Sequence, residues 1–343
     1  MKKLTAIALS GGVDSMITAY LLKQKGHNLV GIHFYTGYGN QSEDKLSEIA
    51  KQTGIDLKIL DCSVEFKSKV TDYFIKAYIS GLTPNPCIVC NPLIKFGTVL
   101  SFAKKLGATS LATGHYARIN KDDFGKYHLL RGIDKKKDQS YFLSRLTPEQ
   151  LSFASFPLGN MTKEEVKKIA ADKGLASLPG NESQDICFTG NKTYGEFIAE
   201  QSLHKSGGGI IEDINGNIIG EHQGLHLFTV GQRRGINCPA AESYYVIRID
   251  VKKNRLVVGF RENIYSRHLE AENINWINNR PTDQIRVETQ IRGRHIPVPS
   301  TLFPAGGSKA KIVFDKPQSS ITPGQGAVFY QGDEVIGGGW IAS

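Results

Sequence analysis

The chain has little of what marks fibrous, disordered or membrane-spanning proteins. Of its 343 residues, 22% are charged and 40% are hydrophobic, and we find no low-complexity segment or convincing internal repeat. No run approaches the roughly 20 apolar residues that cross a bilayer. The apolar run Leu4–Leu9 is too short for an export signal and ends in glycines. We therefore expect a folded cytoplasmic protein with no membrane partner.

Cysteine is also scarce, and its number is odd. An odd count in a reducing compartment argues against a framework of structural disulfides. Cys62 ends an apolar strand, so we interpret it as a small buried hydrophobe, and we assign Cys238 no role. The other three, Cys87, Cys90 and Cys187, are candidates for chemistry or metal binding.

Acidic residues are outnumbered by basic ones. Lys and Arg total 42 against 33 Asp and Glu, which gives a net charge of +9. Such an excess suits a polyanionic partner such as a nucleic acid, although charge alone does not separate this from drift in composition.

The first half of the chain alternates strand-like with helix-like segments. This alternation predicts an α/β domain with a parallel sheet, helices on both faces and ligands beyond the carboxyl ends of the strands. We expect strands at Leu4–Leu9, Asn28–Phe34, Leu57–Leu60 and Ser110–Thr113, and helices at Ser15–Gln24, Asp44–Gln52, Phe66–Ile79, Ile94–Leu106 and Thr162–Lys173.

Later segments are richer in short strands. Tyr127–Arg131 reads as half of a hairpin inserted after the sheet, and residues 206–209 read as a flexible joint. Short strand-like runs separated by Gly, Asn, Pro and Asp then predict two small β-rich domains. We place the domains at residues 1–200, 206–266 and 267–343.

A glycine-rich turn follows the first predicted strand. In Ser10-Gly11-Gly12-Val13-Asp14-Ser15 the glycines allow a sharp turn, and the backbone amides, serine hydroxyls and helix N-terminus can together bind an anion. Asp14 either caps the helix or serves Mg²⁺ or pyrophosphate. The turn resembles the pyrophosphate-loop motif of ATP pyrophosphatases, which cleave ATP between the α and β phosphates and activate a carbonyl oxygen as an adenylate.

Further motifs narrow this resemblance. They occur in order along the chain as Thr83–Asn91 with Ile94-Lys95-Phe96, Ala112–Tyr116, Lys137–Leu143, Glu182–Phe188, Phe228–Gly235 and Pro323–Gln325. Together, from residue 4 to about residue 340, they resemble the bacterial tRNA-specific 2-thiouridylases of the pyrophosphate-loop superfamily. That family replaces the C2 oxygen of the wobble uridine with sulfur.

The resemblance implies a set of site residues. Cys90 matches the nucleophile, Cys187 matches the cysteine that carries a persulfide, and His115 and Gln325 match positions needed for activity. The ATP contacts implied are Ala8, Leu9, Ser10, Gly11, Gly12, Val13, Asp14, Ser15, Phe34 and Gly114. The tRNA contacts implied are Asn85, Pro86, Cys87, Lys137, Asp138, Gln139, Arg292 and Gly293. Arg292 and Arg294 would alternate on a strand and face one side.

The same resemblance implies the reactants. ATP and Mg²⁺ would be the cofactors, and tRNAs for Lys, Glu and Gln would be the substrates. Sulfur would come from a donor protein (a cysteine desulfurase or a relay protein) or from inorganic sulfide. Adenylation would turn the poor C2 leaving group into a phosphate ester, and Cys90 would attack the Cys187 persulfide, leaving a Cys90–Cys187 disulfide.

One departure from the family concerns the cysteines. The common pattern is Asp-x-x-Cys, and here Cys87 stands in place of the aspartate. Cys87, Cys90 and Cys187 could therefore hold a [4Fe–4S] cluster that delivers sulfur, or a zinc ion, or Cys87 could be a spare thiol. Two other functions stay open: a different adenylating synthetase of the superfamily, and a non-catalytic tRNA-binding paralogue.

Overall fold

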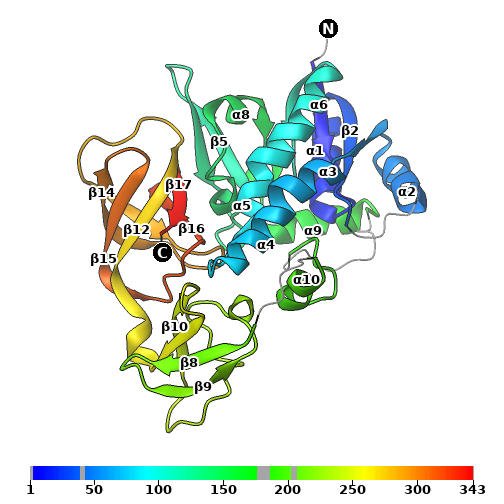
Figure 1. The fold of residues 1–343 in the computed structure, drawn as a ribbon. Coiled ribbons are helices and arrows are strands. Elements are labelled where there is room, and N and C mark those ends of the chain that lie inside the picture. The colour runs from blue at the N-terminus through cyan, green and yellow to red at the C-terminus, as the bar shows by residue number, and fades with distance from the viewer. Residues whose placement is uncertain (1–2, 39–42, 176–185, 202–206, 343) are drawn as a thin grey trace.

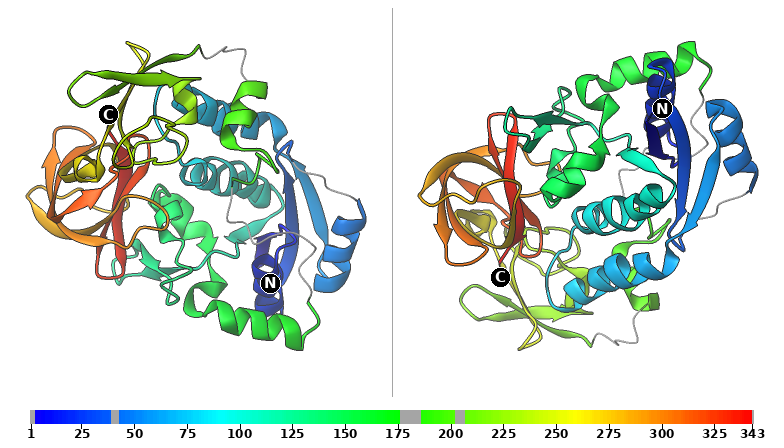
Figure 2. Two further views of the ribbon diagram at one scale, coloured as in Figure 1. Left: turned by 90° about the horizontal axis from the view of Figure 1, so that it is seen from below. Right: turned by 90° about the horizontal axis from the view of Figure 1, so that it is seen from above.

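The computed structural model describes residues 3–38, 43–175, 186–201 and 207–342. Figure 1 shows an N-terminal α/β part, a small β-rich part and a C-terminal barrel. In the two views of Figure 2, the helices of residues 63–105 lie between the parallel sheet and the barrel. The predicted fold class, an α/β domain followed by two β-rich domains, is confirmed.

The parallel sheet carries the first domain. Its order is β3-β2-β1-β4-β7, and every neighbouring pair in it is parallel. This order places β1 in the middle, so the turn after β1 opens at the centre of the sheet's carboxyl edge. The bounds are Leu4–Ala8 for β1, Asn28–Tyr35 for β2, Leu57–Asp61 for β3, Ala108–Ala112 for β4 and Ala154–Ser155 for β7.

Side chains of the central strand alternate between two cores. Ala6 and Ala8 belong to the large core with the helices of residues 63–105, whereas Ile7 packs with Leu22 of α1 on the other face. The latter face carries α1 (Val13–Gln24) and α9 (Lys163–Asp172). A capping box in which Thr162 and Glu165 bond each other's backbone N–H begins α9.

A continuous helical rod from Pro86 to Lys105 crosses the middle of the molecule. It comprises α5 (Pro86–Cys90), a π-helical stretch η2 (Asn91–Val99) and α6 (Leu100–Lys105). Contrary to the sequence expectation, this rod is long and apolar enough to cross a membrane by length and composition alone. Half of it is buried inside the protein, which accounts for its apolar character.

The remaining helices of this domain are shorter. The segment predicted as one helix over Phe66–Ile79 runs through α3 (Ser63–Phe66), the π-helical η1 (Lys67–Thr71) and α4 (Asp72–Ile79). The others are α2 (Glu43–Thr53), α7 (Ser140–Leu143), α8 (Pro148–Phe153), the 3₁₀ turn η3 (Pro157–Asn160) and α10 (Tyr194–Gln201).

The small middle part has a four-stranded sheet in the order β10-β11-β8-β9. The β11–β8 pair is parallel, and the other two pairs are antiparallel. The bounds are β8 (Gly209–Asp213), β9 (Ile218–His222), the 3₁₀ turn η4 (Leu225–Leu227), β10 (Tyr245–Asp250) and β11 (Arg255–Gly259).

The C-terminal part is a closed barrel. Strand β12 pairs with β15 on one side and with β17 on the other, which closes the order β12-β15-β14-β13-β16-β17. The bounds are η5 (Arg261–Ile264), β12 (Tyr265–Trp276), β13 (Ile285–Gln290), β14 (Val298–Ala305), β15 (Lys309–Ser319), β16 (Gly326–Gln331) and β17 (Glu334–Ile341).

A hairpin from the first domain extends this barrel sheet. The strands β5 (Ala117–Lys121) and β6 (Tyr127–Arg131) form it, and Leu130 of β6 pairs with Glu334 of β17. The predicted hairpin strand at Tyr127–Arg131 is confirmed. Because the hairpin lies in the chain between β4 and β7 of the parallel sheet, this pairing connects the barrel to the first domain.

The expected strand position of Arg292 and Arg294 is wrong. Strand β13 ends at Gln290, and both arginines lie in the turn that follows. The amide of His295 donates to the Arg292 carbonyl, and the Gln290 side chain donates to the carbonyls of Arg292 and Gly293. These bonds hold a turn, so the alternation of side chains along a strand cannot be used to place the guanidinium groups of Arg292 and Arg294 on one side.

Candidate active site

The turn after β1 has the features of an anion site. Ser15 is buried, and its Oγ donates to the Gly12 carbonyl at 2.8 Å and lies 3.3 Å from Ser10 Oγ. Gly12 is the N-cap of α1, and within the described residues no side chain accepts a cap hydrogen bond there. The first backbone N–H groups of this twelve-residue helix are thus available to an anion, which fits a phosphate.

Two further predicted ATP contacts lie at the same edge of the sheet. Phe34 is half-buried and stands two residues beyond the Ala8–Ile32 pair in the parallel register. Gly114 follows β4 and touches the loop so closely that an added Cβ would lie 2.9 Å from the Asp14 carbonyl carbon and 3.0 Å from Ser15 N. Glycine is therefore required where this turn meets the Ser10–Ser15 turn, which we call the nucleotide loop after its predicted ligand.

The Asp14 side chain does not cap α1. Its carboxylate accepts hydrogen bonds from Lys163 Nζ at 2.7 and 2.9 Å and from the Tyr116 hydroxyl at 2.8 Å. Lys163 is buried and Asp14 is one-third exposed. Of the two roles expected for Asp14, the capping role is wrong. The carboxylate instead joins the loop to α9.

Two of the candidate cysteines share one face of α5, and a third comes from a distant turn. Cys87 and Cys90 are three residues apart on this helix, and Cys187 lies in the turn just after residue 186. The three are near enough for their charges to influence one another, because ionisation of Cys187 would raise the pKa of both Cys87 and Cys90. All five cysteines lie in the described part of the chain, and each is free.

The thiols differ in surroundings. Burial raises the pKa of Cys90 to about 12, while the positive charge of Lys95 opposes this rise. Cys87 and Cys187 reach solvent, yet surrounding protein raises the pKa of each, and Lys95 again opposes it. Cys62 is fully buried with a pKa raised to about 11, which agrees with its interpretation as a small core residue.

Metal binding by the three cysteines stays a prediction. Among the residues that the structure describes, no group of three or more His, Cys, Asp or Glu side chains is arranged to hold a metal ion. The thiols thus face one region without forming a ligand set as they stand.

Lys95 and His115 connect two parts of the site. One is the helical rod from Pro86 to Lys105, which carries Cys87 and Cys90 and which we call the cysteine helix, and the other is the nucleotide loop. The Lys95 Nζ lies 3.4 Å from His115 Nε2, and the Thr113 hydroxyl lies 2.5 Å from His115 Nδ1. His115 is buried, and its burial together with the Lys95 charge holds its pKa well below the usual value. The Thr113–His115 turn therefore contacts the nucleotide loop through Gly114 and the cysteine helix through His115.

Gln325 supports the start of the helix that carries Cys87 and Cys90. Its Nε2 donates to the carbonyls of Thr83 and Pro84, at 3.1 and 3.2 Å. The next residue, Asn85, is the N-cap of α5, where its Oδ1 accepts from the Ile88 amide at 3.3 Å. This gives Asn85 a structural role beside the predicted tRNA contact, and Pro86 follows as the first helical residue.

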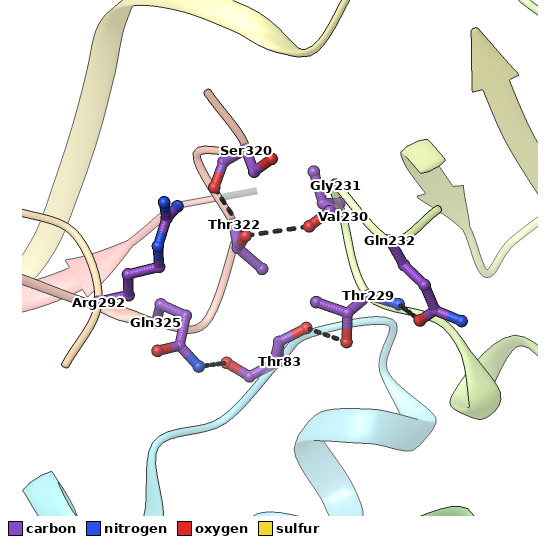
Figure 3. A pocket seen from close by; sticks show the side chains of 9 residues that line it. All are labelled: Thr83, Thr229, Val230, Gly231, Gln232, Arg292, Ser320, Thr322 and Gln325. Carbon is purple, nitrogen blue, oxygen red and sulfur yellow. Dashed lines mark hydrogen bonds between the residues drawn. The ribbon is translucent and has the colours of Figure 1, made fainter. Parts of the chain in front are cut away.

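All three parts of the protein meet near Thr83. Its amide donates to the Pro323 carbonyl, and its hydroxyl donates to Thr229 Oγ1 at 3.2 Å. A cavity of 380 Å³ opens here, and Figure 3 shows Gln325 and Arg292 at its wall. The lining residues are Thr83, Thr229, Val230, Gly231, Gln232, Arg292, Ser320, Thr322 and Gln325. Two predicted site residues thus share this junction.

The other predicted tRNA contacts are partly engaged within the protein. The Asp138 carboxylate accepts from the Gly132 amide at 2.8 Å and from Ser140, and Gln139 Oε1 accepts from the Tyr116 amide at 3.0 Å. Lys137 is half-buried in the turn before them. Gly293 packs on Phe142, whose ring an added Cβ would approach to 2.8 Å.

Sequence reasoning missed Lys95 and Lys163 as site residues. Lys95 belongs to the Ile94-Lys95-Phe96 motif, which supported the family resemblance but did not by itself indicate a role for the lysine. Lys163 offered no signal, because its partner Asp14 is 149 residues away in the chain.

Comparison with known proteins places the chain among relatives over its full length. Residues 3–191, 195–260 and 266–341 match the families described as tRNA methyl transferase HUP domain, tRNA methyl transferase PRC-barrel domain and aminomethyltransferase beta-barrel domain. The chain is 47% identical to the tRNA-specific 2-thiouridylase MnmA of Desulfosudis oleivorans, with 98% of this chain and 94% of the relative covered. It is 40% identical to the protein of that name from Nostoc punctiforme, with 99% of each chain covered.

Proposed function

Since the chain belongs to the family of tRNA-specific 2-thiouridylases, we propose that it uses ATP to replace the C2 oxygen of the wobble uridine in tRNA with sulfur. The expected substrates are tRNAs for Lys, Glu and Gln. The observation that carries the proposal is the contact between two half-sites, the nucleotide loop and the cysteine helix. The turn Thr113–His115 meets the nucleotide loop at Gly114 and the cysteine helix through Lys95.

The first half of the reaction is activation of the base. The uridine C2 oxygen attacks the α-phosphorus of ATP, and pyrophosphate leaves. The exposed Ser10 and Gly12 and the free amides at the start of α1 are suited to hold the phosphates. Mg²⁺ would add charge neutralisation for the pyrophosphate. Asp14 already accepts three hydrogen bonds from Lys163 and Tyr116, which leaves its carboxylate at most one acceptor site for magnesium.

The second half is sulfur transfer. The terminal sulfur of a Cys187 persulfide attacks C2, and AMP leaves with the original oxygen. The Cys90 thiolate then attacks Cys187 Sγ, which breaks the bond between the two sulfurs of the persulfide. The products are 2-thiouridine and a Cys90–Cys187 disulfide, and an external thiol must reduce the disulfide before the next turnover. Both thiols are free in the structure and act on one another electrostatically, which supports this pairing.

Cys87 defines the alternative route. If Cys87, Cys90 and Cys187 hold a [4Fe–4S] cluster, sulfur would reach C2 from the cluster and no persulfide on Cys187 would be needed. The described residues hold no preformed group of three ligands, so binding a cluster would require the three thiols to rearrange. We therefore favour the persulfide route.

An anaerobic thiolation assay separates these possibilities. Protein purified anaerobically and free of iron is given ATP, tRNA and a sulfur source, and 2-thiouridine is measured by mass spectrometry. We expect full thiolation and stoichiometric pyrophosphate release. Cys87→Ser should keep most of the activity, while thiolation that requires reconstituted iron and all three cysteines would establish the cluster route.

The same assay separates the other functions of this superfamily. A different adenylating synthetase would release pyrophosphate without thiolating tRNA and would tolerate Cys187→Ser. A non-catalytic paralogue would bind tRNA and release no pyrophosphate. Cys238→Ser is the matched control, because Cys238 lies in the middle domain, packed against Gly220.

A further inference from the structure

The π-helical winding of η2 brings Lys95 toward the face of Cys90. In an α-helix with 3.6 residues per turn, residues five apart point in directions about 140° apart. A π-helix instead bonds residue i to residue i+5, and its wider turn makes residues five apart point in more similar directions than they do in an α-helix. Cys90 is the residue just before η2, and Lys95 is five residues later. The unusual winding thus turns a lysine toward the cysteines.

Two features near Pro92 account for this winding. Pro92 has no N–H to donate, so a regular hydrogen bond is lost at the start of the stretch. The Gln150 side chain then donates to the Pro92 and Phe96 carbonyls, at 2.8 and 3.0 Å. Carbonyls that an α-helix would satisfy internally are bonded by a side chain from α8, which stabilises the π-helical stretch.

The Lys95–His115 contact fixes how the ring is protonated. A lysine ammonium has only donors, so His115 Nε2 must accept through its lone pair. The proton of the neutral ring then sits on Nδ1, which donates to the Thr113 hydroxyl at 2.5 Å. In this state His115 offers no N–H to a substrate. The group that presents donors at this point is the Lys95 ammonium.

Lys95 is also a half-buried cation without a carboxylate partner among the described residues. A cation removed from bulk water is normally paired with an anion. Its position between the nucleotide loop and the thiols suggests that this anion arrives with the substrate. Of the groups in the proposed reaction, the α-phosphoryl group of the adenylated uridine is the anion that must lie between these two half-sites.

We propose that the Lys95 ammonium binds the α-phosphoryl oxygens during adenylation and departure of AMP, and that His115 is a positioning residue that holds Lys95 in place. This inference rests on the proposed thiolation. It assigns His115, which the sequence marks only as required, the task of accepting a hydrogen bond from Lys95. It also makes Lys95 a catalytic residue of the thiolation.

The test uses the full-length protein with ATP and tRNA, after the wild type has been shown to thiolate. The variants are Lys95→Met, Lys95→Arg, His115→Ala and the double variant Lys95→Met/His115→Ala. Lys104→Met is the matched control, since Lys104 lies on the same rod and pairs with Glu149 at the surface. Thermal unfolding, tRNA affinity, pyrophosphate release and 2-thiouridine are measured for each.

We expect Lys95→Met to lower kcat about 100-fold or more, the cost of removing one charged donor to a transition state, with tRNA affinity within about threefold of wild type. Lys95→Arg should recover part of the rate because it keeps the charge. The double variant should be no slower than Lys95→Met alone, because His115 acts only through Lys95. Lys104→Met should match the wild type.

Three results would overturn the inference. Loss of tRNA affinity equal to the loss of kcat/KM would make Lys95 a contact to the tRNA backbone. Independent, additive effects of the two substitutions would mean that His115 acts directly on the substrate. Wild-type kcat in Lys95→Met would remove the role altogether. Failure of the wild type to thiolate at all is a separate result, which rejects the proposed function instead.

Discussion

Lys163 donates to both carboxylate oxygens of Asp14, at 2.7 and 2.9 Å, and thereby ties α9 to the first turn of α1. The Tyr116 hydroxyl donates to the same carboxylate. The nucleotide loop is therefore held from behind by an ion pair and a hydroxyl before any ligand binds. A loop that is fixed in advance loses little conformational entropy on binding phosphate.

Lys163→Met should destabilise the protein and weaken its use of ATP. The partly buried Asp14 carboxylate would lose its ion-pair partner. We expect this loss to cost only about 1–3 kcal/mol, because Asp14 is 33% exposed and water can partly replace the lysine. Urea unfolding and the KM for ATP measure the two effects. Lys168→Met, at an exposed position of α9, should change neither. Equal stability of the two variants would contradict a structural ion pair.

Gly114→Ala should impair ATP use without a comparable loss of tRNA binding. The new Cβ would lie 2.9–3.0 Å from backbone and side-chain atoms of Asp14 and Ser15, so the turn and the nucleotide loop must move apart. We expect the KM for ATP to rise about tenfold, a change of about 1.4 kcal/mol. Gly306→Ala is the control, because nothing lies within 4 Å of its added Cβ. An unchanged KM would show that the loop tolerates the displacement.

Gln325→Glu should slow thiolation through the start of α5. A carboxylate has no donor at neutral pH, so it would face the Thr83 and Pro84 carbonyls with repulsion where the amide donates two hydrogen bonds. We expect kcat/KM for tRNA to fall about tenfold or more, since unsatisfied buried groups cost about 1–3 kcal/mol. Gln331→Glu at an exposed site on β16 is the matched control. Equal activity of both variants would argue that Gln325 does not position the helix.

His128 should make the junction between hairpin and barrel sensitive to pH. Its ring lies 2.7 Å from Glu334 and 3.1 Å from Asp122, and chiefly the Glu334 hydrogen bond raises the pKa of His128 above its usual value of 6.5. The stabilisation is therefore fully present below about pH 6.5 and is lost as the pH rises through the raised folded-state pKa.

Thermal unfolding between pH 5.5 and 8.5 tests this prediction. The Tm advantage of the wild type over His128→Gln should be largest at the acid end of the range and should shrink as the pH rises. A Tm difference that stays constant, or that grows with pH, would mean that the imidazolium does not hold the hairpin to β17.

The sequence predicted the parallel sheet because the signals were local. Apolar runs such as Leu4–Leu9, a Ser-Gly-Gly turn and the capping box of Thr162 and Glu165 each determine a few neighbouring residues. The barrel strands were found in part for the same reason. Its closure, however, depends on β12 pairing with both β15 and β17, and pairing between distant strands leaves no local pattern.

The site was predicted as motifs and not as a geometry. The chain showed that Cys90, His115 and the nucleotide loop belong to one chemistry through resemblance, but not what joins them. The contact between the cysteine helix and the nucleotide loop depends on the π-helical winding of η2 and on hydrogen bonds from Gln150 to the Pro92 and Phe96 carbonyls. Gln150 is more than fifty residues from both of these residues in the chain. Arg292 was misplaced because the turn after β13 is held by side-chain bonds from Gln290.

The most direct test of the account is a single turnover with sulfur already loaded. Protein carrying a persulfide on Cys187 is mixed with tRNA, with or without ATP, and thiolated uridine, pyrophosphate, AMP and the state of the cysteines are measured. The account predicts one 2-thiouridine per loaded site only with ATP, equal amounts of pyrophosphate and AMP, and a Cys90–Cys187 disulfide. Thiolation without ATP, or by protein carrying Cys187→Ser, would contradict it.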